Sequence, residues 1–141
     1  MTETQNATLQ TLKDNAGTGW VAAWTLTNAA SCAAARSGDA LPFVDAVPLL
    51  LASADLRAAE DYLEQARRGL PTRCAAVDIG SSVVALDGPS ACRGVERVLC
   101  ATLESVRHLR SSEPAGVGAV ELARVDTLLS SARRLLLGSQ R

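Results

Sequence analysis

The longest stretch without a charged residue runs from Asn15 to Ala35 and contains both tryptophans of the chain, four residues apart. A stretch of about 20 residues is long enough to cross a membrane. Insertion depends, however, on large aliphatic and aromatic residues, and this stretch has one leucine and one valine among threonines, serine and asparagine. We therefore predict a helix that is enclosed by other helices of a soluble protein, without a membrane span.

A stripe of aromatic and polar residues follows from helical spacing within this stretch. Residues i, i+4, i+7 and i+11 share one side of a helix, and here they are Trp20, Trp24, Thr27 and Ser31, with Asn28 at the edge. Ligand sites combine apolar walls with a few polar anchors, so the five residues are candidates for ligand binding. We favour packing of both indoles in the core, with their N–H groups bonded to backbone. The pocket is the second interpretation, and a subunit interface is the third.

The composition favours an all-α protein. Alanine and leucine, which are strong helix formers, are abundant, whereas aromatic residues make up only 3% of the chain. A chain of 141 residues fits one domain. We predict a single helical domain over residues 1–141, a bundle of five to six helices in which two are largely enclosed.

Glycines and prolines mark the ends of the predicted helices. A weakly ordered first helix lies within residues 1–16, at about 4–15, and the enclosed second helix covers about 19–36 and ends at Ser37-Gly38. Pro42 and Pro48 open the third helix with a kink or a short break, and Gly69 ends it. Residues 72–86 form either the second enclosed helix, which we favour, or a hairpin. The last two helices cover about 90–111 and 117–137.

The last two helices are amphipathic, with one stripe of apolar residues each. In the first of them the polar arc carries Arg93, Arg97, Glu104 and His108, opposite Val95, Leu99 and Val106. His108, the only histidine, is therefore expected to be exposed.

Charge and cysteine content restrict the function and the location. The net charge is −1, which provides no basic field for nucleic acid. Thirteen arginines accompany a single lysine, as in a GC-rich, actinobacterial genome. The N-terminus lacks the basic and apolar regions of a signal peptide, so we expect a cytoplasmic protein. The four cysteines are Cys32, Cys74, Cys92 and Cys100, and their spacing is not that of paired metal ligands. In a cytoplasmic protein we expect them to be small, buried hydrophobic residues. We expect no metal or cofactor.

Two carboxylates are candidates for catalysis. Asp78 is the only charge between Arg73 and Asp87, and a desolvated carboxylate has a raised pKa that suits a general acid or base. The alternatives are that Asp78 faces water or pairs with an arginine. Glu121 points into the core if its helix starts well before it, but a start near Ala119 makes it a first-turn residue that stabilises the helix dipole. We favour the second interpretation.

The sequence predicts a small-molecule-binding helical protein with an apolar or aromatic ligand. An accessory protein or a cofactor-free enzyme of a bacterial specialised pathway would be of this kind. The alternative is a helical interaction module that binds another protein through one helix face, without a ligand pocket. The high apolar content of a short chain also predicts a homodimer.

Overall fold

A computed structural model describes residues 3–66, 87–112 and 118–138, which contain five α-helices and no strand. The predicted all-α class is confirmed. The helices are α1 (Glu3–Asn15), α2 (Gly19–Ala40), α3 (Phe43–Ala66), α5 (Gly88–Ser112) and α6 (Ala119–Gly138).

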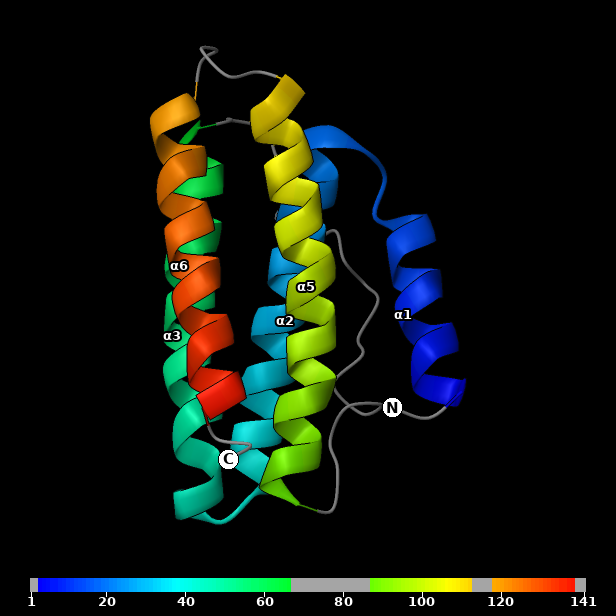
Figure 1. The fold of residues 1–141 in the computed structure, drawn as a ribbon, viewed down its shortest axis with the longest axis vertical. Coiled ribbons are helices and arrows are strands. Elements are labelled where there is room, and N and C mark those ends of the chain that lie inside the picture. The colour runs from blue at the N-terminus through cyan, green and yellow to red at the C-terminus, as the bar shows by residue number, and fades with distance from the viewer. Residues whose placement is uncertain (1–2, 67–86, 113–117, 139–141) are drawn as a thin grey trace.

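Four long helices form a bundle, and α1 lies beside it (Figure 1). Around the bundle α2 packs on α3, α3 on α6, α6 on α5 and α5 on α2, and each of these neighbours runs antiparallel to the next. The helices on the diagonals, α3 with α5 and α2 with α6, run in the same direction (Figure 1). Two antiparallel interfaces, α2–α3 and α5–α6, therefore lie on opposite sides of the bundle.

The core is built from small and medium apolar side chains. Leucines of α3 and α6 fill its centre together with valines of α5, and most of α2 is buried. Alanines supply much of the buried surface of α2, so its neighbours can approach closely. The prediction that the helix from Gly19 is largely enclosed is confirmed.

The predicted end of this helix at Ser37-Gly38 is wrong, because α2 continues to Ala40. Both residues are buried, and a Cβ added to Gly38 would lie 2.7 Å from Cδ2 of Leu50 on α3. Gly38 is thus a point of close contact between α2 and α3. A glycine used for packing inside a helix and a glycine that ends one look the same in sequence.

The other boundaries follow the prediction within a few residues. Pro48 lies inside α3 without ending it, since a proline near the first turns removes few helical hydrogen bonds. The helix α5 begins at Gly88, two residues early, because the Asp87 carboxylate accepts a hydrogen bond of 2.8 Å from the Ser90 backbone N–H. This backbone bond, together with a second one from the Ser90 side chain, lowers the pKa of Asp87.

Several sequence predictions concern residues 67–86. Residues 72–86, predicted as the second enclosed helix with a hairpin as the alternative, lie outside the described residues. Asp78 and Cys74 belong to this segment. Among the other cysteines, Cys92 is buried and Cys100 is half-buried, but Cys32 is exposed at the outer edge of α2, which contradicts the prediction that it is buried. None of the helices described here has the length and apolar content that a membrane span requires.

Candidate functional site

The structure places the predicted aromatic stripe mainly in the core. Trp20, Trp24, Thr27 and Ser31 are buried, and only 2% of the Trp24 surface is exposed. The Thr27 hydroxyl donates a hydrogen bond of 2.7 Å to the Ala23 carbonyl in its own helix. The predicted core packing of the indoles is observed, and the ligand-binding role of the stripe stays a prediction.

Two residues of the stripe reach carboxylates of α3. The indole Nε1–H of Trp24 donates to Oε1 of Glu64 over 3.1 Å, and the Asn28 amide Nδ2 donates to Oε1 of Glu60 over 3.3 Å. Trp24 and Asn28 are one turn apart on α2, as Glu60 and Glu64 are on the antiparallel α3. We call these four residues the α2–α3 seam. The indole N–H thus bonds a carboxylate, whereas the sequence predicted backbone.

The seam carries an unusual carboxyl group. The pKa of Glu60 is raised to about 7, mainly by burial, and the hydrogen bond from Asn28 opposes this effect only in part. The negative charges of Glu64 and Asp61 contribute to the raised pKa, whereas Arg57 lowers it. Because neutral donors rather than cations face the two glutamates, Glu60 shifts between its protonated and ionised forms near neutral pH.

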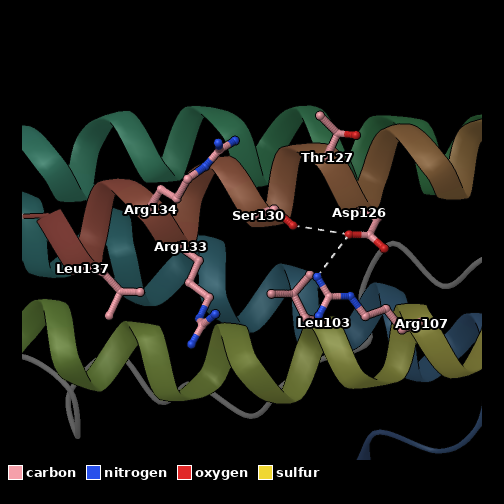
Figure 2. Close-up of a pocket in the computed structure, with 8 residues that line it drawn as sticks. All are labelled: Leu103, Arg107, Asp126, Thr127, Ser130, Arg133, Arg134 and Leu137. Carbon is pink, nitrogen blue, oxygen red and sulfur yellow. Dashed lines mark hydrogen bonds and ion pairs between the residues drawn. The ribbon is translucent and has the colours of Figure 1, made fainter.

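On the opposite side of the bundle, α5 and α6 enclose a half-open groove with a volume of about 430 Å³. We call it the α5–α6 groove, and Figure 2 draws its lining residues: Leu103, Arg107, Asp126, Thr127, Ser130, Arg133, Arg134 and Leu137.

Side chains from both helices point into the space between them (Figure 2). Arg133 and Leu137 extend from α6 toward α5, and Arg107 extends from α5 toward Asp126. Thr127 and Arg134 lie on the side of α6 that faces α3. The residues that α6 turns toward α5 follow one helical stripe at i, i+4, i+7 and i+11: Asp126, Ser130, Arg133 and Leu137.

Ion pairs join α5 and α6 at two places along the groove. At one end Asp126 accepts hydrogen bonds from Arg110 at 2.7 Å and from Arg107 at 3.4 Å. Further along, between Ser130 and Leu137, Nε of Arg133 lies 2.9 Å from Oε1 of Glu96. Leu103 and Ser130 lie between these pairs in the two sequences, so the middle of the groove combines an apolar side chain with a hydroxyl group.

Two titratable groups beside the groove are held in defined states. Burial by itself would raise the pKa of Asp126, but hydrogen bonds from Arg107 and Arg110 outweigh it and lower the pKa below its usual value. Burial raises the pKa of Cys100, and its Sγ donates to Oε1 of Glu96 over 2.9 Å. Asp126 is therefore a carboxylate at neutral pH, and Cys100 is a protonated thiol rather than a nucleophile.

A second groove, of about 450 Å³, lies between α3 and α6. It is more open and mostly apolar, and the Arg124 guanidinium lies 5.4 Å from the centre of the Tyr62 ring at its edge. A cation over an aromatic ring is a common surface stabilisation. This groove has few polar groups that could orient a ligand.

Of the two predicted catalytic carboxylates, the structure describes only Glu121, and the catalytic role of both stays a prediction. Asp78 is outside the described residues, and Glu121 lies in the first turn of α6, which starts at Ala119. Glu121 is half-buried there and is well placed to stabilise the helix dipole. His108 is exposed, as predicted. In the described ranges no three residues among His, Cys, Asp and Glu converge as metal ligands.

Sequence analysis missed Glu60, Glu64 and the residues of the α5–α6 groove. A signal was present for both sites. For the first, two glutamates lie one turn apart near the end of α3, which carries five acidic residues and one arginine. For the second, the sequence of α5 places polar residues at spacings of four, seven and three beside its apolar stripe: Glu96, Cys100, Arg107 and Arg110.

Comparison of the chain with known protein families, with curated proteins and with solved structures finds no match. The function must therefore be inferred from the residues of this molecule.

Proposed function

We propose that this protein binds a small molecule and that the α5–α6 groove is its binding site. The observation that carries the proposal is the composition of the groove: guanidinium and hydroxyl groups surround Leu103 and Leu137 in one concave space between two helices. Small-molecule sites have volumes of about 300–1,000 Å³ and join apolar walls to a few polar groups. The groove, at about 430 Å³, lies in this range.

The ion pairs support the proposal because they hold charged side chains of the groove in place. Arg133 is tied to Glu96 on the opposite helix, and Asp126 to Arg110. Groups that are held by their neighbours lose less conformational entropy when a ligand binds. We also propose a cytoplasmic location and a role in a bacterial specialised pathway. The arginine-rich composition and the features of the N-terminus support this part of the proposal.

Native mass spectrometry of the protein, purified gently from its own organism, tests this function. We expect a non-covalently bound small-molecule mass that is lost in Leu137→Trp, since a large side chain at this half-exposed position narrows the groove. The matched control is Leu51→Trp on α3, which is also partly exposed and lies outside the groove. Absence of any bound mass, or equal loss in both variants, would contradict the proposal.

The second candidate function is a helical interaction module, and the start of α3 favours it. Phe43 and Val44 are 78% and 83% exposed, and Leu50 and Leu51 on the next turns are partly exposed. Exposed apolar side chains that lie together are typical of interfaces. In this alternative the surface pairs with a second copy of the chain, as the predicted homodimer requires.

Light scattering during size-exclusion chromatography tests this alternative. A dimer that Phe43→Ser and Val44→Ser convert to a monomer would support it. A monomer at all concentrations would rule out the pairing of two copies and leave the small-molecule proposal unaffected.

A further inference from the structure

We infer that the ligand of the α5–α6 groove carries an oxyanion, a carboxylate or a phosphate ester, attached to a small apolar group. This inference rests on the proposed function and adds the chemical class of the ligand. It is based on the charges along the groove, on the hydrogen-bond donors that the ion pairs leave unused, and on the two leucines.

Positive charge is in excess at the groove. Three guanidinium groups between α5 and α6, those of Arg107, Arg110 and Arg133, accompany two carboxylates, Asp126 and Glu96. Arg134 adds a fourth at the side of the groove that faces α3. Arginine stays protonated at any physiological pH, and Asp126 and Glu96 each already accept bonds from arginine. A ligand with one or two negative charges would balance the excess.

Two of these guanidinium groups, those of Arg133 on α6 and Arg107 on α5, retain donors. Arg133 uses Nε for the bond to Glu96, and a guanidinium has five N–H groups. Arg107 contributes the longer bond to Asp126, 3.4 Å against 2.7 Å for Arg110. Asp126 therefore keeps a close cation when Arg107 turns toward a ligand. Guanidinium groups bind carboxylates and phosphates through paired, charge-assisted hydrogen bonds.

The hydroxyl groups of the groove do not offer a second binding position for the anion. Ser130 donates to Asp126 over 3.3 Å, and Thr127 donates to the Ala123 carbonyl over 3.1 Å. Their protons are thus used within the protein, so Arg107 and Arg133 are the donors for the oxyanion. Leu103 and Leu137, which line the same groove, would contact the apolar part of the ligand.

Binding of three ring-containing probes, followed by two-dimensional amide NMR and titration calorimetry, tests the inference. Benzoate and phenyl phosphate carry the oxyanion, and their relative affinity identifies the preferred source. Benzyl alcohol is the neutral control. We expect both anions to shift amide signals of α5 and α6 near the groove, and benzyl alcohol to bind at least about tenfold more weakly.

Arginine variants locate the anion. Arg133→Gln and, separately, Arg107→Gln should each weaken anion binding about tenfold. Arg133→Lys, which keeps the charge but not the paired donors, should weaken it less. The matched control is Arg97→Gln, an exposed arginine of α5 outside the groove, which should leave binding unchanged. Thermal melts of every variant check that the fold persists, and Arg107, the more exposed of the two, is the safer substitution.

The outcomes separate this inference from the proposed function. If benzyl alcohol shifts the same amides as tightly as the anions and both glutamine variants bind normally, the groove binds ligands but does not select an oxyanion. Equal weakening in Arg97→Gln would mean unspecific attraction, which also overturns the inference. If none of the probes shifts groove residues at millimolar concentration, while native mass spectrometry shows a bound mass that Leu137→Trp removes, only the oxyanion class is wrong. If that mass is absent as well, both proposals fail.

Discussion

The α2–α3 seam and the α5–α6 groove are both antiparallel helix pairs with polar residues one turn apart, yet their electrostatics are opposite. In the seam, neutral donors of Trp24 and Asn28 face the carboxyl groups of Glu64 and Glu60. In the groove, guanidinium groups face carboxylates and outnumber them. The seam is thus short of positive charge, and the groove has it in excess.

The two interfaces accommodate charge in different ways. Hydrogen bonds to neutral donors do not compensate a buried negative charge, so the seam favours a protonated Glu60. The groove is more exposed, its charges remain ionised, and unused arginine donors can bind a ligand. The seam therefore contributes mainly to stability and its pH dependence, whereas the groove is the better place for recognition.

The largest loss of stability is expected from Trp24→Ala in the seam. The indole is buried, and removal of a buried aromatic side chain costs about 3–5 kcal/mol of unfolding free energy. Urea unfolding measures this cost. Val21→Ala, at a partly exposed position of the same helix, is the control and should cost less than about 1 kcal/mol. A cost for Trp24→Ala as small as that of the control would mean that the seam is not tightly packed.

Gly118→Ala should have the next largest effect, through the other indole of α2. Gly118 has φ of +92°, and an added Cβ would lie 2.7 Å from Cη2 of Trp20. Backbone strain and the clash together should cost about 2–3 kcal/mol. Thermal unfolding would show the loss. Gly138→Ala, where an added Cβ meets nothing within 4 Å, should leave stability unchanged or raise it. Unchanged stability of Gly118→Ala would contradict close packing around Trp20.

Glu60→Gln tests whether ionisation of Glu60 makes the stability of the protein depend on pH. The pKa of Glu60 is higher in the folded protein, about 7, than the ordinary value of 4.5, so the folded state binds the proton more tightly. The resulting stability is present below about pH 4.5 and is lost as the pH rises through about 7. With allowance for partial exposure, the loss is about 1–2 kcal/mol. Urea unfolding from pH 4.5 to 8 should show that Glu60→Gln lacks this loss.

The neighbouring substitution Asp61→Asn, at an exposed position on the same helix, should keep most of the loss seen in the natural protein. A pH dependence that Glu60→Gln leaves intact would show that another group is responsible.

The smallest effect on stability is expected in the groove, from Asp126→Asn. Its pKa is lowered in the folded protein, so its contribution is present above the ordinary pKa of about 3.8 and disappears as the pH falls through the lowered value. Because its arginine partners are largely exposed, we expect a cost of at most about 1 kcal/mol at pH 7. Unfolding at pH 7 and at a series of pH values below about 3.8 measures it. A cost that does not decline as the pH falls through this range would have to come from packing rather than charge.

Parts of both regions could be predicted from local sequence. The uncharged stretch around Trp20 and Trp24 indicated an enclosed helix, and Ala119 was identified as a start of α6 that makes Glu121 a first-turn residue. The partners of Trp24 and Asn28 could not be predicted, because Glu64 and Glu60 are 40 and 32 residues away. Gly38 shows the same limit, since only its contact with Leu50 distinguishes a packing glycine from a helix end.

Local sequence predicts the helices and their apolar faces, because helix formation depends on residues within about one turn of one another. Which of these faces meet depends on how the helices pack. The antiparallel register of α2 and α3 places two carboxyl groups against neutral donors, and that of α5 and α6 places Arg133 against Glu96 and Asp126 against Arg110. Whether a glutamate is ionised or an arginine has unused donors depends on the side chains across the interface, since charge and burial act through space and not along the chain.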